Sequence, residues 1–254
     1  SASAVLCEEE KEAGVAIVDI GGGTTDIAVF YDSIIYHTAV IPFGGNIITE
    51  DIRQGCSIIK KHAEEIKVKF GSAVASENSE DEVVSIPGMR GREAKEISFK
   101  NLAYIIQSRL EEIFDLVNFE IQKVNSNHKL IAGIVLTGGG SMMKHIAQLA
   151  EFKTGMEVRL GNPNESLAKS TDDLSSPMYS TGIGLVIEGF AKYESDVKRG
   201  VVSDENKNIG IRRSEPEEQE KPAKTEKPKS ERFSIKDIIT GFTGFFKQED
   251  LDKN

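Results

Sequence analysis

Apolar and polar positions follow three different patterns along this chain. Residues 1–195 hold short apolar runs separated by turn residues, which is typical of a folded α/β domain. Residues 196–231 are polar, rich in Glu and Lys, and contain three prolines. A segment with so little apolar surface to bury cannot offset the entropy lost on ordering, so we expect a disordered linker there. Residues 232–254 regain apolar character and form a separate terminal segment.

The first apolar runs predict a buried strand followed by a hairpin. Residues 15–20 are apolar except for Asp19, and three glycines follow them. Residues 26–30 and 34–40 come next with a very short connection, a spacing that favours a tight antiparallel hairpin. Gly44 and Gly45 then interrupt the pattern.

Helical spacing begins with Ile59, Ala63, Ile66 and Phe70, which recur at i, i+4, i+7 and i+11. Gly71 follows this stripe as a natural C-terminal cap. The sequence therefore predicts a helix that ends near residue 70.

Two short strands and a long helix are predicted next. Residues 83–86 and 93–97 flank a Pro-Gly pair and have the composition of strands. Ser98 is a suitable N-cap for the helix that follows. Its core side is expected to hold eight apolar residues: Leu102, Ile105, Ile106, Leu110, Ile113, Leu116, Val117 and Ile121.

The last folded part repeats the order strand, glycine turn, helix. Residues 131–136 predict a buried strand, and a helix is expected near residues 142–152. Residues 158–160 predict a short strand. Ser176 and Pro177 open a final helix, with serine as the cap and proline at the first helical position.

This order of elements predicts an α/β fold in which an α+β insert interrupts a sheet-containing lobe. The lobe is expected at residues 1–43 and 130–192, since both glycine-rich turns flank the helical region. The inserted subdomain is expected at about residues 44–129.

Composition narrows the class of protein. The 254 residues are 39% hydrophobic and 28% charged, which is ordinary for a globular domain, and carry a formal net charge of -10. This acidic balance argues against a general nucleic-acid binder, whose affinity depends on basic surface. No apolar run reaches the ~20 residues of a membrane-spanning helix, and no signal peptide is recognisable. Because the chain opens at Ser1 without a methionine, we expect that it begins inside a longer protein.

Cysteine and histidine positions indicate no metal or nucleophile site. Cys7 and Cys56 lack metal-like spacing and indicate a reduced, cytosolic setting. The histidines are scattered, at His37, His62, His128 and His145. No nucleophile pattern is readable, so we assign no catalytic residue.

The turn after the first strand reads Asp-Ile-Gly-Gly-Gly-Thr-Thr-Asp over residues 19–26. Consecutive glycines let backbone N–H groups approach an anion without an intervening Cβ, and a carboxylate at the strand end suits a hydrated Mg²⁺. The alternative is a glycine-rich hairpin turn with incidental acids. The full combination predicts a phosphate site made of Asp19, Gly21, Gly22, Gly23, Thr24 and Thr25, with Asp19 holding Mg²⁺ through water.

A second glycine-rich turn follows the strand predicted at residues 131–136. After Thr137 it consists of Gly138, Gly139, Gly140 and Ser141, and it leads into a predicted helix. A helix N-terminus presents free N–H groups and a partial positive charge, which suits phosphate or ribose. A plain strand-to-helix turn is the alternative, but two such turns together predict a nucleotide held between them.

Glu64 and Lys67 lie three residues apart on the helix that ends near residue 70, away from its apolar stripe. Two interpretations fit this pair. It is either a solvated helix face or a pair that hydrogen-bonds an adenosine.

These motifs resemble those of a known superfamily. Residues 19–26 resemble the second phosphate loop of the actin and heat-shock-chaperone ATPases, and residues 137–141 resemble their adenosine loop. Residues 63–67, Ala-Glu-Glu-Ile-Lys, resemble the adenine-side helix of the bacterial members. Three further segments narrow the resemblance to the FtsA family of bacterial cell-division proteins: SASAVL at residues 1–6, GGN at 44–46 and STGIGL at 180–185. The resemblance extends nearly continuously over residues 1–195.

The resemblance implies an actin-like (ribonuclease H-like) fold that binds ATP and Mg²⁺ with weak or no hydrolysis and self-associates into actin-like filaments. It implies binding to the tail of the tubulin-like FtsZ and to other divisome proteins, at the cytoplasmic face of the inner membrane at midcell. The family's other lobe, which carries the first phosphate loop, has no counterpart before Asp19, so this chain holds half of a nucleotide cleft. Arg109 on the long predicted helix is the candidate for meeting the acidic FtsZ tail, unless it is merely solvated.

Three alternatives share the superfold. A sugar or acetate kinase has no use for a charged linker that ends in an apolar helix. A chaperone ATPase should continue into a β-rich peptide-binding domain, and a rod-shape filament protein such as MreB lacks this long linker. Fold alone does not decide between them.

The terminal segment predicts an amphipathic helix that binds anionic membrane. In helical projection its apolar positions fall within an arc of about 120°: Ile235, Ile238, Ile239, Phe242, Phe245 and Phe246. The helix would be roughly 20 Å long, which is too short to span a bilayer but suits its interface. The linker, with a reach of roughly 30 Å, would let the globular part turn above the membrane. The alternative is a helix that folds back onto the domain or a partner.

Overall fold

The computed structural model describes residues 1–88, 93–125, 129–163 and 172–199. The predicted terminal helix at residues 232–254 lies outside the described residues, and so do His128 and the linker beyond residue 199. The expectations for those segments stay predictions.

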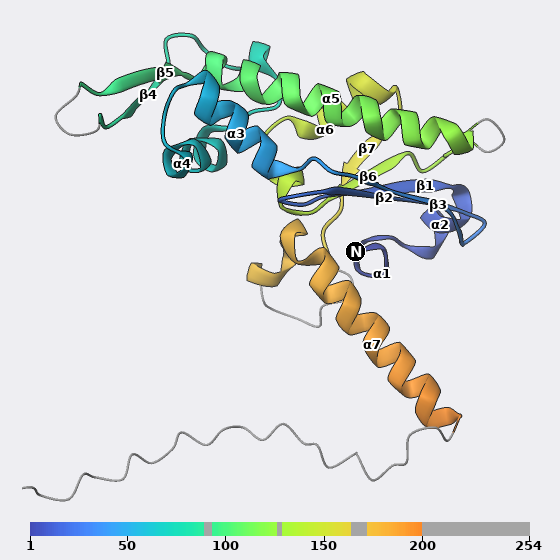
Figure 1. Ribbon diagram of the computed structural model, residues 1–254. Coiled ribbons are helices and arrows are strands. Elements are labelled where there is room, and N and C mark those ends of the chain that lie inside the picture. The colour runs from blue at the N-terminus through green and yellow to red at the C-terminus, as the bar shows by residue number, and fades with distance from the viewer. Residues whose placement is uncertain (89–92, 126–128, 164–171, 200–254) are drawn as a thin grey trace, which may run out of the picture. The chain divides into compact units, whose positions relative to one another are not determined.

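A five-stranded mixed sheet forms the centre of the described chain (Figure 1). Its strand order is β3-β2-β1-β6-β7, in which β1, β2 and β3 are antiparallel neighbours and β6 is parallel to both β1 and β7. The strands are β1 (Val15–Ile20), β2 (Thr25–Tyr31), β3 (Ile34–Ile41), β6 (Ile134–Thr137) and β7 (Val158–Leu160).

The predicted buried strand and hairpin are confirmed. The hairpin turns on Asp32 and Ser33, whose φ angles of 48° and 61° match a two-residue turn of the primed type. Asp19 pairs with Asp26 across the antiparallel ladder and with Thr137 across the parallel one. Both glycine-rich turns therefore begin at the same end of β1.

Both faces of the central strands are buried, and their side chains alternate between two cores. Val18 and Ile20 join a large core on one face, while Val15 and Ile17 join a smaller core on the other. This arrangement explains why residues 15–20 read as a continuous apolar run.

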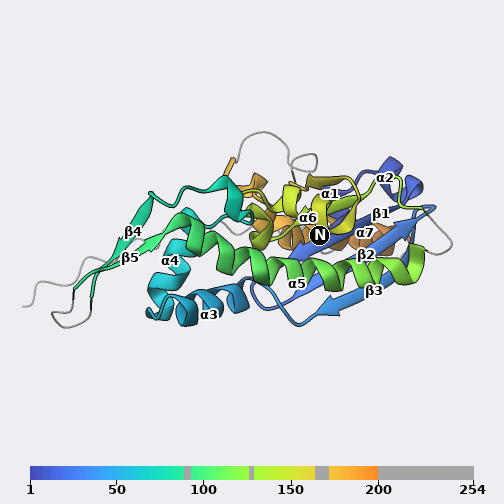
Figure 2. The same cartoon turned by 90° about the horizontal axis from the view of Figure 1, so that it is seen from above.

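Four helices contribute buried side chains to the large core, and Figures 1 and 2 show the longest of them running along that face of the sheet. They are α3 (Gly45–Gly55), α4 (Lys60–Phe70), α5 (Phe99–Asn125) and α6 (Ile146–Thr154). A separate two-stranded sheet, β4 (Val83–Ile86) with β5 (Lys95–Ser98), precedes α5. All of α3 to α5 falls between β3 and β6, where the insert is expected.

The long helix α5 follows its predicted pattern closely. Its N-cap is confirmed, because the backbone N–H of Asn101 donates to Ser98 Oγ at 3.2 Å. Six of the eight expected core residues are buried, and Ile105 is partly buried against the core. The prediction that Leu116 is a core residue is wrong, because this residue is 38% exposed. Since α5 contacts β2, β3 and α6 as well as α3, one core runs through both the lobe and the insert.

Two predicted boundaries near the second glycine turn are wrong. The strand predicted at residues 131–136 begins at Ile134, because Gly133 adopts a left-handed φ of 66° in a turn and leaves Ile131 70% exposed. The helix predicted at 142–152 begins at Ile146, because His145 has a φ of 62° and Lys144 forms a bridge with Ser72.

Two further local predictions need correction. The sequence pattern missed α3, which opens at Gly45 and buries Ile48 and Ile52 in the large core. Ser176 makes no cap hydrogen bond, and Pro177 opens a short 3-10 turn that precedes the last helix.

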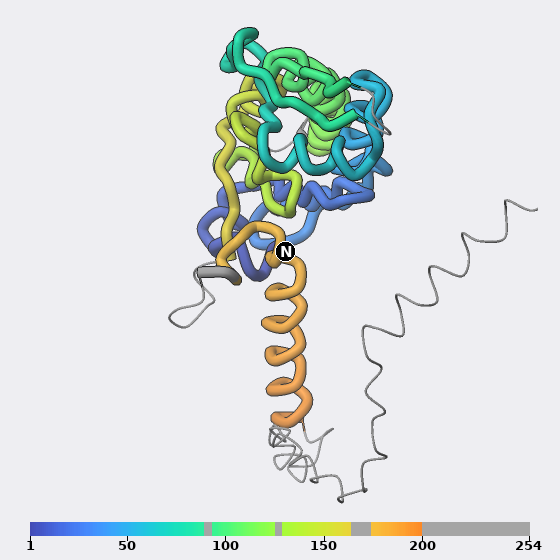
Figure 3. The backbone as a smooth tube through the Cα atoms, turned by 90° about the vertical axis from the view of Figure 1, so that its left-hand side faces the viewer, coloured from blue at the N-terminus to red at the C-terminus, as the bar shows by residue number. Residues whose placement is uncertain are grey.

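The smaller core on the opposite face of the sheet is completed by α1 (Ala2–Val5) and by the first turns of α7 (Ser180–Lys198), and these two helices contact each other. Helix α2 (Glu8–Ala13) contacts β2. Figure 3 shows α7 on the far side of the strands from α5. Within the described ranges, no helix combines the length and apolar character needed to cross a membrane.

Candidate functional site

A pocket of about 380 Å³ lies where the two glycine-rich turns meet α4. The first turn contributes Gly21 and Gly22, and the second contributes Gly139 and Gly140. The remaining apolar lining comes from β1, α3, α4 and α5 and from the segments that hold residues 142–143 and 178. These lining residues are Ile20, Ile48, Val68, Leu110, Met142, Met143 and Met178. The structure therefore places Gly22 and Gly139 on one pocket and not at opposite ends of the sheet.

Three of the glycines leave open space where a side chain would stand. A Cβ on Gly23 would meet no atom within 4 Å, and one on Gly139 would come no closer than 3.9 Å to Met178. On Gly22 the nearest atom would be Asn46 Nδ2 at 3.6 Å, an ordinary contact. None of the three has a left-handed φ. The open space beside these backbones leaves room for a ligand to approach them closely.

The first turn is held in place by the start of α3. Gly45 donates its N–H to Gly21 O at 2.9 Å, and Asn46 donates to Gly22 O at 2.8 Å. Gly44 must be glycine, because a Cβ there would lie 2.5 Å from Gly21 O. The sequence analysis did not assign Asn46 to the site, although it lines the pocket.

Asp19 ends β1 beside both turns. Its Oδ2 accepts a hydrogen bond of 2.6 Å from the Thr181 hydroxyl at the start of α7. A Cβ on Gly138 would lie 2.3 Å from Asp19 Oδ1, and Gly138 has a left-handed φ of 82°, so the second turn packs directly on this carboxylate. In the part of the chain that the structure describes, no three His, Cys, Asp or Glu residues cluster as metal ligands. Any metal held here would be coordinated by one carboxylate, by water and by oxygens of the ligand, which is the usual coordination of Mg²⁺ in nucleotide sites.

Two predicted hydroxyl donors point into the protein. Thr25 is fully buried and donates to Phe43 O at 2.8 Å. Ser141 is also fully buried and donates to Gly138 O at 2.8 Å. Both hydroxyls therefore brace the turns, and the expectation that Thr25 donates to a phosphate needs correction. Thr24 is exposed and donates to Asp26 Oδ2 at 2.9 Å.

Glu64 and Lys67 both line the pocket, so the pair is not a plain solvated helix face. Lys67 Nζ donates to Glu64 Oε2 at 2.8 Å, to Thr49 Oγ1 at 2.8 Å and to Gly45 O at 3.0 Å. Burial acts to raise the pKa of Glu64, but hydrogen bonds from Lys67 and Thr49 and the Lys67 charge outweigh it and lower this pKa. Glu64 is therefore a carboxylate at neutral pH.

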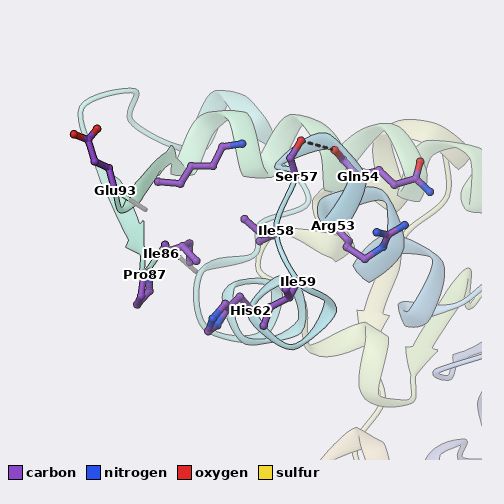
Figure 4. A pocket seen from close by; sticks show the side chains of 11 residues that line it. Arg53, Gln54, Ser57, Ile58, Ile59, His62, Ile86, Pro87 and Glu93 are labelled. Carbon is purple, nitrogen blue, oxygen red and sulfur yellow. Dashed lines mark hydrogen bonds between the residues drawn. The ribbon is translucent and has the colours of Figure 1, made fainter. Parts of the chain in front are cut away.

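A larger cavity of about 670 Å³ lies away from the glycine turns, between the end of α3, the start of α4 and the β4–β5 sheet (Figure 4). Arg53 and His62 contribute to its wall, together with Ile86 and Lys95. The Arg53 guanidinium is paired with Glu50, and its hydrogen bonds lower the Glu50 pKa to about 2. No predicted site residue lines this cavity.

Arg109 is engaged inside the protein. Its Nε donates to Asp51 Oδ2 at 2.6 Å and its Nη2 to Asp51 Oδ1 at 3.1 Å, while Nη1 pairs with Glu112. The guanidinium also lies 5.9 Å from the centre of the Phe43 ring. The hydrogen bond to Asp51 raises the pKa of Arg109, so the guanidinium stays charged. This charge is already paired with the carboxylates of Asp51 and Glu112.

Comparison with known proteins connects this geometry to a family. The family described as "Cell division protein FtsA" matches residues 16–184, a range that contains both glycine turns and the α4 pair. The chain belongs to the FtsA family.

Curated FtsA relatives agree with this assignment. The Pseudomonas aeruginosa protein is 42% identical over 201 residues, covering 79% of this chain and 48% of that protein. The Neisseria meningitidis protein is 44% identical over 187 residues (73% and 45%), and the Escherichia coli K12 protein is 38% identical over 213 residues (80% and 50%). This FtsA-family chain spans about half the length of the curated relatives it matches.

Solved structures confirm the actin-like fold of this FtsA-family chain. MreB5 of Spiroplasma citri bound to AMPPNP superposes with a TM-score of 0.63 at 22% identity, covering 78% of this chain and 59% of that one. A PilM–PilN type IV pilus biogenesis complex matches with a TM-score of 0.54 at 19% identity (71% and 47%). At such identities the likeness shows the fold alone. The family assignment, not the fold, decides against the kinase and chaperone alternatives.

Proposed function

We propose that this chain carries half of an ATP–Mg²⁺ site in a cell-division protein that links the FtsZ ring to the cytoplasmic face of the inner membrane. The observation that carries the proposal is the pocket of about 380 Å³ shared by both glycine turns and α4. MreB5, which shares the fold, has been solved with AMPPNP and with ADP. Membership of the FtsA family supports a nucleotide that acts as an assembly ligand more than as fuel.

Each wall of the pocket suits a different part of a nucleotide. Backbone N–H groups near Gly22 and Gly139, with no Cβ in the way, suit phosphate oxygens. Glu64 is anionic and would repel phosphate, so it suits the hydroxyl or amino donors of the nucleoside. The apolar walls suit a planar base. The residues present therefore fit ATP, with Asp19 holding Mg²⁺ through water.

Removing the Asp19 carboxylate is expected to weaken Mg²⁺-dependent ATP binding by about tenfold, a loss of about 1.4 kcal/mol. The reason is that Asp19 ends β1 beside both glycine turns and packs directly against Gly138. Calorimetric titrations of the complete protein with ATP, with and without Mg²⁺, would compare wild type with Asp19→Ala.

Asp115→Ala is the matched control, because that carboxylate sits on the exposed side of α5 and pairs with Lys153. It is expected to bind ATP as wild type does. Equal Mg²⁺ dependence in Asp19→Ala and Asp115→Ala would remove Asp19 from the metal site.

The proposed partners are those of a divisome protein: the FtsZ tail, further copies of this chain in actin-like filaments, other divisome proteins and anionic lipid. The insert that contains α5 is the proposed receptor for the FtsZ tail. Family membership supports these partners, and the acidic net charge of -10 gives no support for a nucleic acid.

A substitution of Arg109 tests whether this residue contacts the FtsZ tail. An acidic tail would have to compete with Asp51 and Glu112 for this guanidinium. If the tail meets Arg109, fluorescence polarisation with a labelled FtsZ tail should show binding about tenfold weaker for Arg109→Glu, the loss of one charge-assisted contact. Arg53→Glu, on the neighbouring cavity, is the control. Equal binding by wild type and Arg109→Glu would exclude this residue from the FtsZ site.

A further inference from the structure

Thr49 is a buried polar residue at the centre of the hydrogen bonds that join α3 to α4. Thr49 is 1% exposed, and no role was predicted for it because α3 itself was not predicted. The hydroxyl donates to Glu64 Oε2, and Gly45 O lies 3.0 Å away as a second acceptor. Lys67 Nζ donates to the same hydroxyl at 2.8 Å. Thr49 therefore contacts both charged residues of the pair.

The ammonium group of Lys67 is committed inside the protein. A lysine has three N–H donors, and Lys67 points them at three oxygens, on Gly45, Thr49 and Glu64. Lys67 is only 9% exposed, although it lines the pocket. Its charge is thus used to hold neighbours, which differs from the expectation that it hydrogen-bonds an adenosine directly.

Glu64 keeps one oxygen for a ligand. Both hydrogen bonds to its carboxylate end on Oε2, and among the described residues Oε1 receives none. The Glu64 side chain is 48% exposed and lines the pocket. A free glutamate would lose rotamer entropy on binding a ligand, whereas one fixed at Oε2 has lost it already.

The same turn of α3 also fixes the first glycine turn. Gly45 accepts from Lys67 through its carbonyl and donates its N–H to Gly21 O at 2.9 Å. The hydrogen bonds from Gly45 and Asn46 that hold the first glycine turn do not involve the Thr49 hydroxyl.

We propose that Thr49 is a positioning residue that, with Lys67, holds Glu64 Oε2 so that Oε1 meets a donor on the nucleoside part of the ligand. This role rests on the proposed nucleotide site. Thr49 touches no ligand itself and acts through Glu64. Its loss should weaken recognition of the nucleoside and leave recognition of the phosphates unchanged.

The test compares ATP–Mg²⁺ with tripolyphosphate–Mg²⁺ by calorimetry on the complete protein. Thr49→Val keeps the side-chain shape, removes the hydroxyl, and is expected to weaken ATP binding about fivefold to tenfold, the size of the net contribution of one ordinary hydrogen bond. Its tripolyphosphate affinity should stay within about twofold of wild type. Thr49→Ser restores the hydroxyl and should bind ATP as wild type does.

A double-mutant cycle separates a positioning role from a general loosening of the fold. If Thr49 acts through Glu64, then adding Thr49→Val to Glu64→Gln should change ATP affinity by less than about twofold beyond Glu64→Gln alone. Wild-type ATP affinity in Thr49→Val, an equal loss for ATP and tripolyphosphate, or additive losses in the double variant would each overturn the role. A wild-type protein that binds ATP no more tightly than tripolyphosphate would overturn the role of Thr49 too. Wild type that binds neither ligand would overturn the proposed function itself.

Discussion

Gly22→Ala is expected to lower the affinity for ATP–Mg²⁺ at least about 30-fold, roughly 2 kcal/mol, while the folded protein stays as stable as wild type. Gly22 lines the pocket, and an added Cβ would make only ordinary contacts, with Asn46 at 3.6 Å. Its φ is not left-handed, so alanine fits the backbone, and the loss of unfolded-state freedom offsets any small cost. The methyl group would stand where a phosphate must approach the backbone. Calorimetry measures the affinity, and urea unfolding measures the stability.

Gly189→Ala is the matched control for this prediction. Gly189 is an exposed glycine within α7, and a Cβ there would meet no atom within 4 Å. This variant should bind ATP normally and be equally stable or slightly more stable, because alanine favours helix. If Gly22→Ala binds ATP as tightly as Gly189→Ala does, the first glycine turn is not the phosphate site.

The second large effect is expected at the membrane. Phe242→Glu combined with Phe245→Glu should abolish co-sedimentation of the complete protein with anionic lipid vesicles. Burying each phenylalanine contributes about 1.5–3 kcal/mol, so losing both should lower vesicle affinity by at least about 100-fold. Both residues belong to the apolar arc predicted between Ile235 and Phe246, outside the described residues.

A matched pair of charges away from the arc controls for net charge. Phe233→Glu with Gln248→Glu adds the same two acids, but neither position lies on the predicted apolar arc. Those variants should still sediment with vesicles, apart from a modest loss from electrostatic repulsion. Normal sedimentation of the Phe242→Glu, Phe245→Glu protein would show that this segment is not the anchor.

The elements that were predictable from sequence are those whose signals are local. Residues 15–20 are apolar except for Asp19 because both faces of β1 are buried, and the hairpin follows from a short polar turn. Ser98 precedes α5 and caps it as expected. In contrast, the false strand start at residue 131 arose because apolar composition carries no sign that Gly133 is left-handed.

The candidate site was predictable as a set of backbone turns but not as a set of side-chain contacts. The glycine turns were identified because the first stands with two threonines between Asp19 and Asp26, and because a second glycine turn follows another strand. The hydroxyl of Thr25 donates a hydrogen bond to Phe43 O, 18 residues away in the sequence. The ammonium group of Lys67 donates one to Gly45 O, 22 residues away. Such partners depend on tertiary packing and cannot be read from local sequence. The same holds for the contact of Thr49 with Lys67 and for the ion pair of Arg109 with Asp51.

A crystal structure of the complete protein with ATP and Mg²⁺ tests the central claim most directly. The account predicts phosphates beside Gly22 and Gly139, Mg²⁺ reached by Asp19 through water, and the nucleoside within hydrogen-bond distance of Glu64 Oε1. Nucleotide density in the other cavity, beside Arg53 and Lys95, with the pocket between the glycine turns empty, would contradict it.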